Sequence, residues 1–232
     1  MDRVLGFDTS TGLLTVAVTA GEQVLEERAV EPDPSGRPRH ARELLVAVED
    51  VLSGSGGWDG LGKIAVGLGP GTFTGLRIGI ATARSLAQAR GIPVVGISSL
   101  RALAANATAR RVLAVLDAKR TEAFAALYES DGREIWEPWV GSPQGLAKRV
   151  TKEAEPPLAI GDGAVRFREE LEASGAEVPA DEDSLHRLRA RHVCLIATET
   201  AAGPLEQIKP TYLRRPDAEL WRERNRRPTG GR

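Results

Sequence analysis

The stretch at residues 63–79, KIAVGLGPGTFTGLRIG, constrains the fold more than any other part of the chain. It begins with a short apolar run bounded by a glycine, and this length and composition predict a buried strand. Gly69, Pro70 and Gly71 then predict a tight turn, because glycine reaches backbone angles that strain other residues. From Gly75 onward, apolar residues recur at helical spacing. The sequence therefore predicts a strand, a glycine turn and a helix in succession.

A glycine turn in front of a helix can bind an anion, because the backbone N–H groups at the helix start point outward. Gly69, Gly71 and Thr72 are therefore candidate nucleotide-binding residues, and the Thr72 hydroxyl can also cap the helix. The turn is not a P-loop, since no lysine follows its last glycine. The alternative is a close-packed turn whose small helix residues let another backbone approach. From the residues alone, both interpretations stay open.

Bulk composition limits the class of protein. Of the 232 residues, 41% are hydrophobic but only 4% are aromatic, so small aliphatic side chains have to build the core. A net charge of −1 predicts no strong overall attraction to nucleic acid. The single cysteine, Cys194, excludes an intrachain disulfide and a cysteine-based metal cluster. No apolar run approaches the ~18 residues of a membrane-spanning helix, and none near the start resembles a signal peptide. We expect a cytoplasmic protein without membrane contact.

The order strand, strand, strand, helix, strand, helix is expected twice along the chain. RVLGFD at residues 3–8 and RVLAVLD at residues 111–117 echo each other, and each opens one copy. A repeat of this length is a duplication of whole subdomains and not a short-period solenoid. We expect subdomains at residues 1–108 and 109–216. Helices are expected at residues 39–52, 75–90, 142–150, 165–174 and 185–202.

The string GPGTFTGLRIG is specific enough to resemble one family. It is similar to the TsaB family, also called YeaZ, the non-catalytic partner of TsaD in making threonylcarbamoyladenosine in tRNA. Supporting matches are DTST at residues 8–11, His40 at a helix start, SSL at residues 98–100 and PTYLR at residues 210–214. The resemblance covers nearly the whole chain and ends near Arg215. It implies an α/β fold of duplicated βββαβα subdomains, as in the actin, hexokinase and Hsp70-like (ASKHA) superfamily.

The same superfamily contains kinases, so an active small-molecule kinase is the main competing function. In such kinases, an acidic residue at the end of the first strand holds hydrated Mg²⁺ while small hydroxyl residues touch phosphate. Asp8, Thr9 and Ser10 occupy this place. The alternative is that these three side chains only satisfy backbone groups of the turn.

The second half of the chain argues against a kinase. The second phosphate loop of these kinases needs glycines after its aspartate, so that backbone N–H groups can approach phosphate. Here Asp117 is followed by Ala118-Lys119-Arg120, with two long side chains and no glycine. Gly161 and Gly163 occupy the place of the adenosine-binding segment, but the aspartate between them is unusual beside a base.

Metal and peptidase functions find little support. TsaD enzymes hold iron or zinc through a His-x-x-x-His pair on one helix face, whereas His40, His186 and His192 are spaced otherwise. We therefore expect no metal and no cofactor, and we expect His40 to be a surface or capping residue. Cys194 lies in an apolar run, which predicts a buried, inert thiol. No Ser-His-Asp order is evident for a peptidase acting on TsaD, the third candidate function.

The TsaB resemblance implies partner binding through the helices at residues 39–53 and 75–90. In the family, these helices form a four-helix bundle with TsaD or with a second copy of TsaB. The second helix is small and apolar on more than one face, which favours burial against a partner. The expected interface residues are Leu44, Leu45, Val48, Leu52, Gly75, Arg77, Ile78, Gly79, Ile80 and Ala83.

We therefore interpret the chain as an inactive scaffold and not as an enzyme. It would bind a TsaD-like protein, assemble with a TsaE-like ATPase and contact tRNA indirectly. The complex would transfer threonylcarbamoyl to adenosine 37 of tRNAs that read ANN codons. Alone, the chain would form a homodimer. The Arg-rich tail at residues 217–232 either contacts tRNA phosphates or is a solvated, frayed helix, and the second interpretation is favoured.

Overall fold

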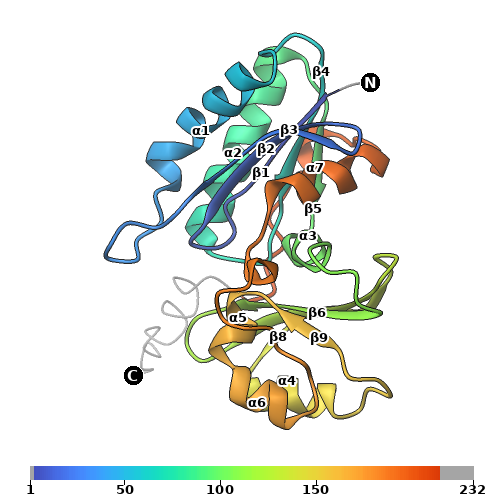
Figure 1. Ribbon diagram of the computed structural model, residues 1–232. Helices are drawn as coiled ribbons and strands as arrows, with labels where there is room; N and C mark the ends of the chain where they lie inside the picture. Colours follow the sequence, from blue (N-terminus) through green and yellow to red (C-terminus); the bar gives the residue numbers. More distant parts are fainter. Residues whose placement is uncertain (1–2, 215–232) are drawn as a thin grey trace, which may run out of the picture.

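A computed structural model of the protein describes residues 3–214, which form two α/β subdomains stacked one above the other (Figure 1). The strands of the first subdomain are β1 (Arg3–Asp8), β2 (Leu14–Ala20), β3 (Gln23–Val30), β4 (Leu61–Gly67) and β5 (Val94–Ile97). Its helices are α1 (His40–Gly54), α2 (Phe73–Arg90) and α3 (Ser99–Ala104). The strands of the second are β6 (Arg111–Asp117), β7 (Ala123–Glu129), β8 (Glu134–Gly141) and β9 (Leu158–Ile160). Its helices are α4 (Pro143–Val150), α5 (Asp162–Arg166) and α6 (Arg168–Ala173). The chain continues through the 3-10 turn η1 (Ser184–His186), the helix α7 (Ala190–Glu199) and the 3-10 turn η2 (Leu205–Gln207).

The two sheets repeat one topology. The first has the strand order β3-β2-β1-β4-β5, and the second has the order β8-β7-β6-β9. The strand β1 pairs antiparallel with β2 and parallel with β4, just as β6 pairs antiparallel with β7 and parallel with β9. Equivalent strands therefore hold equivalent places, and the expected duplication of a βββαβα unit is confirmed.

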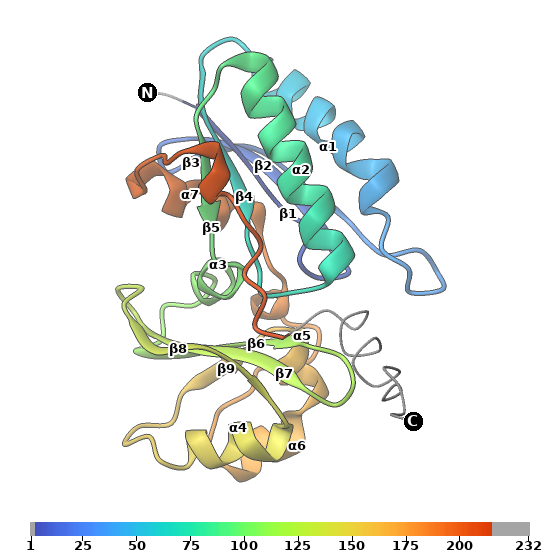
Figure 2. The ribbon, with the colours of Figure 1, turned by 180° about the vertical axis from the view of Figure 1, so that it is seen from behind.

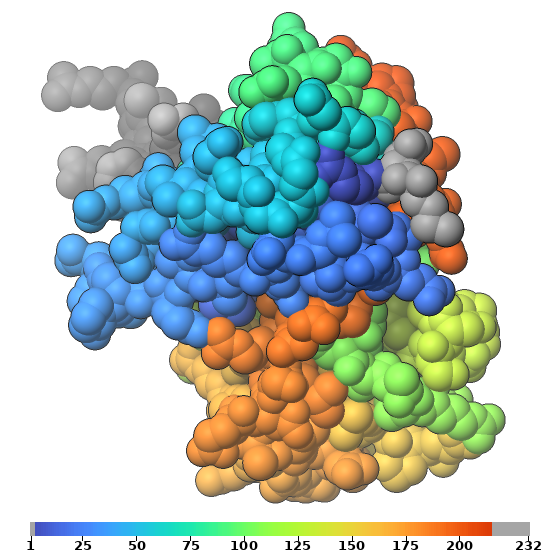
Figure 3. Space-filling model, turned by 45° about the horizontal axis from the view of Figure 1, so that its top comes forward, coloured from blue at the N-terminus to red at the C-terminus, as the bar shows by residue number. Residues whose placement is uncertain are grey.

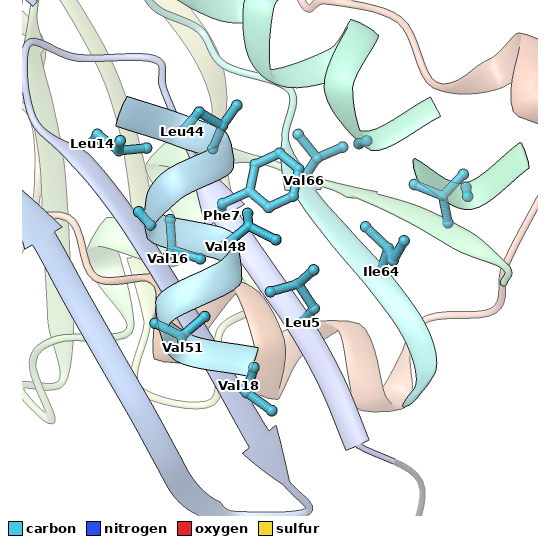
Figure 4. Packing of buried hydrophobic residues seen from close by; sticks show 14 of the residues in the cluster. Leu5, Phe7, Leu14, Val16, Val18, Leu44, Val48, Val51, Ile64 and Val66 are labelled. Atoms are coloured by element: carbon cyan, nitrogen blue, oxygen red, sulfur yellow. The ribbon is translucent and has the colours of Figure 1, made fainter. Parts of the chain in front are cut away.

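The first sheet is covered by helices on both faces: α1 and α2 lie on one side and α7 on the other (Figures 1 and 2). Because successive side chains of a strand point to opposite faces, Leu5 and Phe7 pack towards α1 and α2, whereas Val4 packs with α7. Figure 4 shows Phe7 close to Leu44 of α1 and to Val66 of β4. These aliphatic contacts, with one aromatic ring among them, form the larger core.

The helix α7 returns to the first sheet after the chain has built the second subdomain. On α7, Cys194 lies against Gly6 of β1, where a Cβ atom would come within 2.5 Å of the cysteine Sγ atom. From β4, the Lys63 ammonium donates a hydrogen bond to the Ala197 carbonyl at 2.6 Å. The assignment of residues 109–216 to one subdomain is therefore wrong for α7, because β1 needs an apolar cover on its second face.

Some expected element bounds differ from the observed ones. The helix expected at residues 165–174 is divided into α5 and α6 at Phe167, whose ring enters the core of the second subdomain. The helix expected at residues 185–202 starts only at Ala190, because Arg189 before it is extended. The Arg-rich tail at residues 217–232, on which the alternatives of a tRNA contact and a solvated helix fall, lies outside the described residues. Within residues 3–214, no helix combines the length and the apolar character that crossing a membrane would require.

The start of α2 packs directly against the loop that follows β1. The Thr9 hydroxyl donates a hydrogen bond to the Gly75 carbonyl at 2.8 Å. A Cβ atom on Gly75 would lie 2.0 Å from the Thr9 carbonyl oxygen, and one on Gly79 would lie 2.3 Å from Thr9 Oγ1. The small residues of α2 are therefore explained by a close approach within the chain.

We predict that Gly75→Ala destabilises the isolated chain by roughly 1–3 kcal/mol, because the added methyl group would overlap the Thr9 carbonyl. The control is Ala89→Ser on the exposed side of the same helix, which should change the free energy of unfolding by less than about 0.5 kcal/mol. Urea denaturation followed by circular dichroism measures both values. An unchanged stability of Gly75→Ala would contradict the described contact.

Candidate functional site

The loop after β1 encloses the carboxylate of Asp8. Its Oδ1 atom accepts a hydrogen bond from the Ser10 backbone N–H at 2.7 Å, and its Oδ2 atom accepts one from the Ser99 hydroxyl at 2.5 Å. Asp8 is only 1% exposed, and a Cβ atom on Gly67 would lie 1.7 Å from its Oδ2 atom. Both carboxylate oxygens therefore stabilise the loop, whereas a magnesium-holding carboxylate has to face solvent and ligand.

The glycine turn between β4 and α2 packs against the same loop. The Thr72 backbone N–H donates a hydrogen bond to the Ser10 carbonyl at 2.7 Å. A Cβ atom on Gly71 would lie 2.3 Å from that carbonyl oxygen, and Gly69 has a φ of +91°. These glycines therefore permit contact between two chain segments. Thr72 holds the N-cap position of α2 as expected, but its side chain accepts no capping hydrogen bond.

The loop after β6 is the counterpart of the loop after β1, and its aspartate is paired with cations. Asp117 Oδ2 lies 2.8 Å from Lys119 Nζ and 2.7 Å from Arg166 Nη1. Burial alone would raise the pKa of Asp117, but hydrogen bonds from these two cations and from the Lys119 N–H hold it below its usual value. Lys119, Arg120 and Thr121 follow in left-handed conformation, with φ values of 62°, 53° and 60°. This loop therefore brings two cationic side chains to the place where a phosphate-binding loop would have glycines.

The two glycines at the start of α5 pack against β6. Gly161 has a φ of +113°, and a Cβ atom there would lie 2.1 Å from the Val115 carbonyl oxygen. A Cβ atom on Gly163 would lie 2.7 Å from the Leu116 carbonyl carbon. The Gly161 N–H donates to His186 Nδ1 at 3.1 Å. Both glycines are thus explained by helix–strand packing.

A cleft of about 230 Å³ lies between the subdomains, where the glycine turn faces the loop after β6. Lys119, Arg120 and Arg214 contribute cationic side chains to its lining, so the cleft is suited to attract an anion. Of the nine expected nucleotide-binding residues, the structure brings three to this lining: Gly71, Thr72 and Asp117. The lining does not include the remaining six, which are Asp8, Thr9, Ser10, Gly69, Gly161 and Gly163.

His40, His186 and Cys194 have structural roles in the described chain. His40 is 3% exposed and its Nε2 atom lies 2.9 Å from the Thr11 carbonyl oxygen, so the expectation of a surface residue is wrong. Burial lowers the pKa of His40 and keeps its imidazole neutral. Cys194 is fully buried, as expected, and burial raises the pKa of its thiol. Among residues 3–214, no three His, Cys, Asp or Glu side chains are grouped to hold a metal ion.

Most of the expected interface residues lie inside the chain's own core. The buried ones are Leu44, Val48, Leu52, Gly75, Gly79, Ile80 and Ala83. The apolar stripe of α1 faces the sheet, and the small residues of α2 face the sheet and the loop at Thr9. Packing within the chain therefore accounts for these seven residues, and contact of any of them with a partner stays a prediction. Leu45 and Arg77 remain exposed, and Ile78 is partly exposed.

The outer side of the two helices and the segment beside them carry Leu45 and Arg77, which were expected at the interface, and three apolar or aromatic residues that sequence patterns did not single out, Val46, Phe73 and Tyr212. Leu45 is 60% exposed, Val46 49%, Phe73 36% and Tyr212 40%. The Phe73 and Tyr212 rings stack with centroids 5.3 Å apart, and the Arg77 guanidinium lies 3.8 Å above the Phe73 centroid. We call these five residues the α1–α2 face. Its two aromatic residues lie within the GPGTFTGLRIG and PTYLR motifs. Those motifs could therefore have indicated both residues from the sequence.

A groove runs along α2 beside this face. It has a volume of about 620 Å³ and lies between α2 and the segment at residues 208–212. Arg77, Arg84 and Lys209 contribute to its lining together with Ile80 and Ala81. The space-filling view shows the first subdomain, blue to green, above the yellow and orange second subdomain (Figure 3).

Known proteins resemble the chain over nearly its whole length. A family model described as TsaD, tRNA N6-adenosine threonylcarbamoyltransferase, matches residues 24–220. The tRNA threonylcarbamoyladenosine biosynthesis protein TsaB of Escherichia coli K12 is 31% identical over 91% of this chain and 94% of that protein. The protein of the same name from Bacillus subtilis is 26% identical over 93% of this chain and 96% of that protein.

Solved structures also show similarity to this family. YeaZ from Pseudomonas aeruginosa superposes with a TM-score of 0.78 at 29% identity, covering 92% of this chain and 100% of that one. A ROK hexokinase from Thermus thermophilus superposes with a TM-score of 0.51 at 16% identity over 85% of this chain and 99% of that one, which shows the fold alone. With the duplicated actin-like architecture and this full-length similarity in place, the chain belongs to the TsaB (YeaZ) family.

Proposed function

We propose that the chain acts in the biosynthesis of tRNA threonylcarbamoyladenosine as a non-catalytic scaffold that binds a TsaD-like protein. Its TsaB relatives are named for this pathway. The observation that carries the proposal is a contrast within the first subdomain. Asp8 is enclosed by its own loop, whereas Leu45 and Val46 are exposed on α1.

The composition of the α1–α2 face supports a protein partner. Aromatic residues and arginine are enriched at protein interfaces, and charged residues such as lysine and glutamate are depleted from their centres. Phe73, Tyr212 and Arg77 form one stacked group, and the neighbouring helix α1 exposes the apolar Leu45 and Val46. Helices with exposed apolar residues gain stability when a partner helix covers them.

The same face would serve a homodimer of the isolated chain. A two-fold axis that pairs one patch with itself is the simplest closed assembly, and two helices from each subunit would form a four-helix bundle. Homodimer and complex with the TsaD-like protein would then exclude each other. A TsaE-like ATPase and tRNA would join through that complex, and the proposal gives this chain no direct tRNA contact.

The competing kinase function is less well supported. A kinase of this fold needs a carboxylate that is free to hold hydrated Mg²⁺ and a second loop that wraps phosphate. Asp8 uses both oxygens in hydrogen bonds within the chain, and Asp117 is paired with Lys119 and Arg166. For a peptidase, the only cysteine is a buried thiol whose pKa is raised by burial.

We predict that Leu45→Asp abolishes both associations while the monomer stays folded. Leu45 is 60% exposed, so the new carboxylate is solvated in the monomer. Burying it unpaired in an interface costs several kcal/mol, which is a large part of the roughly 8 kcal/mol of a micromolar complex. Sedimentation velocity, with and without the TsaD-like protein, measures both associations.

Two matched variants control this experiment. Leu44→Asp changes the neighbouring residue, which is 2% exposed, and should unfold the monomer. Ala154→Asp places the same charge on an exposed turn of the second subdomain and should leave both associations intact. If Leu45→Asp still dimerises and still binds the TsaD-like protein, the interface lies elsewhere. Loss of one association alone would refute a shared surface.

We also predict that the isolated chain does not hydrolyse ATP, because neither loop aspartate is available to a nucleotide-bound magnesium ion. Release of inorganic phosphate from ATP and Mg²⁺ should stay at the level of buffer. Turnover above that level which is lost in Asp8→Asn, with an unchanged circular dichroism spectrum, would establish the kinase-like function instead. Asparagine is the suitable replacement because it keeps the size of the side chain and one acceptor oxygen.

A further inference from the structure

The groove along α2 is formed by two parts of the chain that lie far apart in the sequence. On α2, Arg77, Ala81, Arg84 and Gln88 line it, and their spacing of three or four residues places them on one face of the helix. The segment at residues 208–212 forms the opposite side and runs beside α2 in Figure 2. Between Arg77 and Gln88 the groove follows about three turns of α2, which is long enough for another helix to pack.

The segment after η2 is fixed to the first subdomain, so this side of the groove is preformed. Ile208 is 4% exposed and belongs to the core between the helices α1 and α2 and the sheet. The Thr211 N–H donates a hydrogen bond to the Leu68 carbonyl at 2.8 Å. The Tyr212 ring stacks on Phe73. A preformed groove binds a partner without the entropic cost of ordering a loop.

The charged side chains of the groove all have the same sign. Among the described residues, Arg77, Arg84 and Lys209 line it, and no Asp or Glu does. Within residues 3–214, neither Arg84 nor Lys209 forms an ion pair. The net charge of the whole chain is only −1, so this excess of positive charge is local. The groove therefore attracts acidic groups.

The groove also has an apolar part, which favours a protein over a nucleic acid as its occupant. Ile80 and Ile208 contribute to the lining, and the small, exposed Ala81 lets the surface of another helix come close. A nucleic-acid backbone is bound through cations and polar groups, so it would gain little from these apolar side chains. A polypeptide with both acidic and apolar side chains matches the whole lining.

We propose that the groove docks an acidic amphipathic helix of the protein partner. This docking rests on the proposed function, because Arg77 and Tyr212 belong both to the groove and to the α1–α2 face. The apolar side of the docked helix would cover Ala81, and its Asp and Glu side chains would reach Arg84 and Lys209. Complementary charge selects the partner and speeds the encounter. The interface would thereby extend from the two helices to the segment after η2.

The first arm of the test reverses the two unpaired charges. Arg84→Glu/Lys209→Glu should weaken binding to the immobilised TsaD-like protein at least about tenfold in biolayer interferometry, because like charges would then face each other. Both residues are exposed, so the monomer should stay folded, and circular dichroism checks this. The matched control is Lys148→Glu/Lys152→Glu, which makes the same change in net charge at exposed positions of the second subdomain. It should bind within about threefold of the unchanged chain, because distant charges are screened.

The second arm uses salt. Raising NaCl from about 50 to about 500 mM should weaken the unchanged chain at least about tenfold, because salt screens attraction between opposite charges. The variant Arg84→Glu/Lys209→Glu should bind no more weakly at the higher concentration, since salt there screens repulsion. The same loss of affinity with salt in both chains would place the charge contacts elsewhere and overturn the proposal.

The outcomes separate this docking from the proposed scaffold function. If the unchanged chain does not bind the TsaD-like protein at all, both are overturned. If Arg84→Glu/Lys209→Glu binds with full affinity while Leu45→Asp does not bind, the scaffold function stands and the acidic helix is refuted. Fluorescence anisotropy with labelled tRNA tests the other polyanion. Loss of tRNA binding in the charge-reversed variant, with full affinity for the TsaD-like protein, would assign the groove to nucleic acid instead.

Discussion

The packing of the loop after β1 against α2 is the contact on which the rest of the structure depends. Thr9 fills the space left by Gly75 and Gly79, so the helix lies directly on the loop. On the other side of the same loop, Asp8 joins its own backbone to Ser99 at the start of α3. One short segment therefore fixes the glycine turn, α2 and α3 relative to the central strand β1.

This contact also supports the scaffold function that we propose. In a kinase of this fold, the same loop has to leave room for a phosphate and a magnesium ion. Here the room is taken by the chain itself, because a Cβ atom on Gly71 would already lie 2.3 Å from the Ser10 carbonyl oxygen. Rigid packing of α2 on the loop then leaves the outer side of the helix, with Phe73 and Arg77, in a fixed position for a partner. The cleft between the subdomains is lined by cationic residues, and the carboxylate in its lining, Asp117, is paired with Lys119 and Arg166.

The sequence predicted the elements and their duplication well, since apolar periodicity and glycine turns report local structure. It did not distinguish Leu44, which is 2% exposed, from Leu45, which is 60% exposed, because both fall on one broad apolar stripe. The exact orientation of α1 on the sheet decides between them. The small residues of α2 predicted a second apolar face for a partner. Instead, its glycines make room for the side chain of Thr9.

Other features depended on contacts between distant segments. The return of α7 to the first sheet could not be read from its own apolar run, because any uncovered sheet face would have suited it. The burial of His40 depends on the Thr11 carbonyl, 29 residues before it in the chain. Local patterns therefore predicted the architecture, while the positions of functional side chains required the assembled fold.

The most direct measurement for the scaffold proposal is the molar mass of the chain mixed with its TsaD-like partner, by size-exclusion chromatography with light scattering. Because one surface is proposed for both associations, added partner should convert the homodimer into a complex with one copy of each chain. Two results would contradict the account. One is the absence of any complex. The other is a larger species in which the intact homodimer carries the TsaD-like protein.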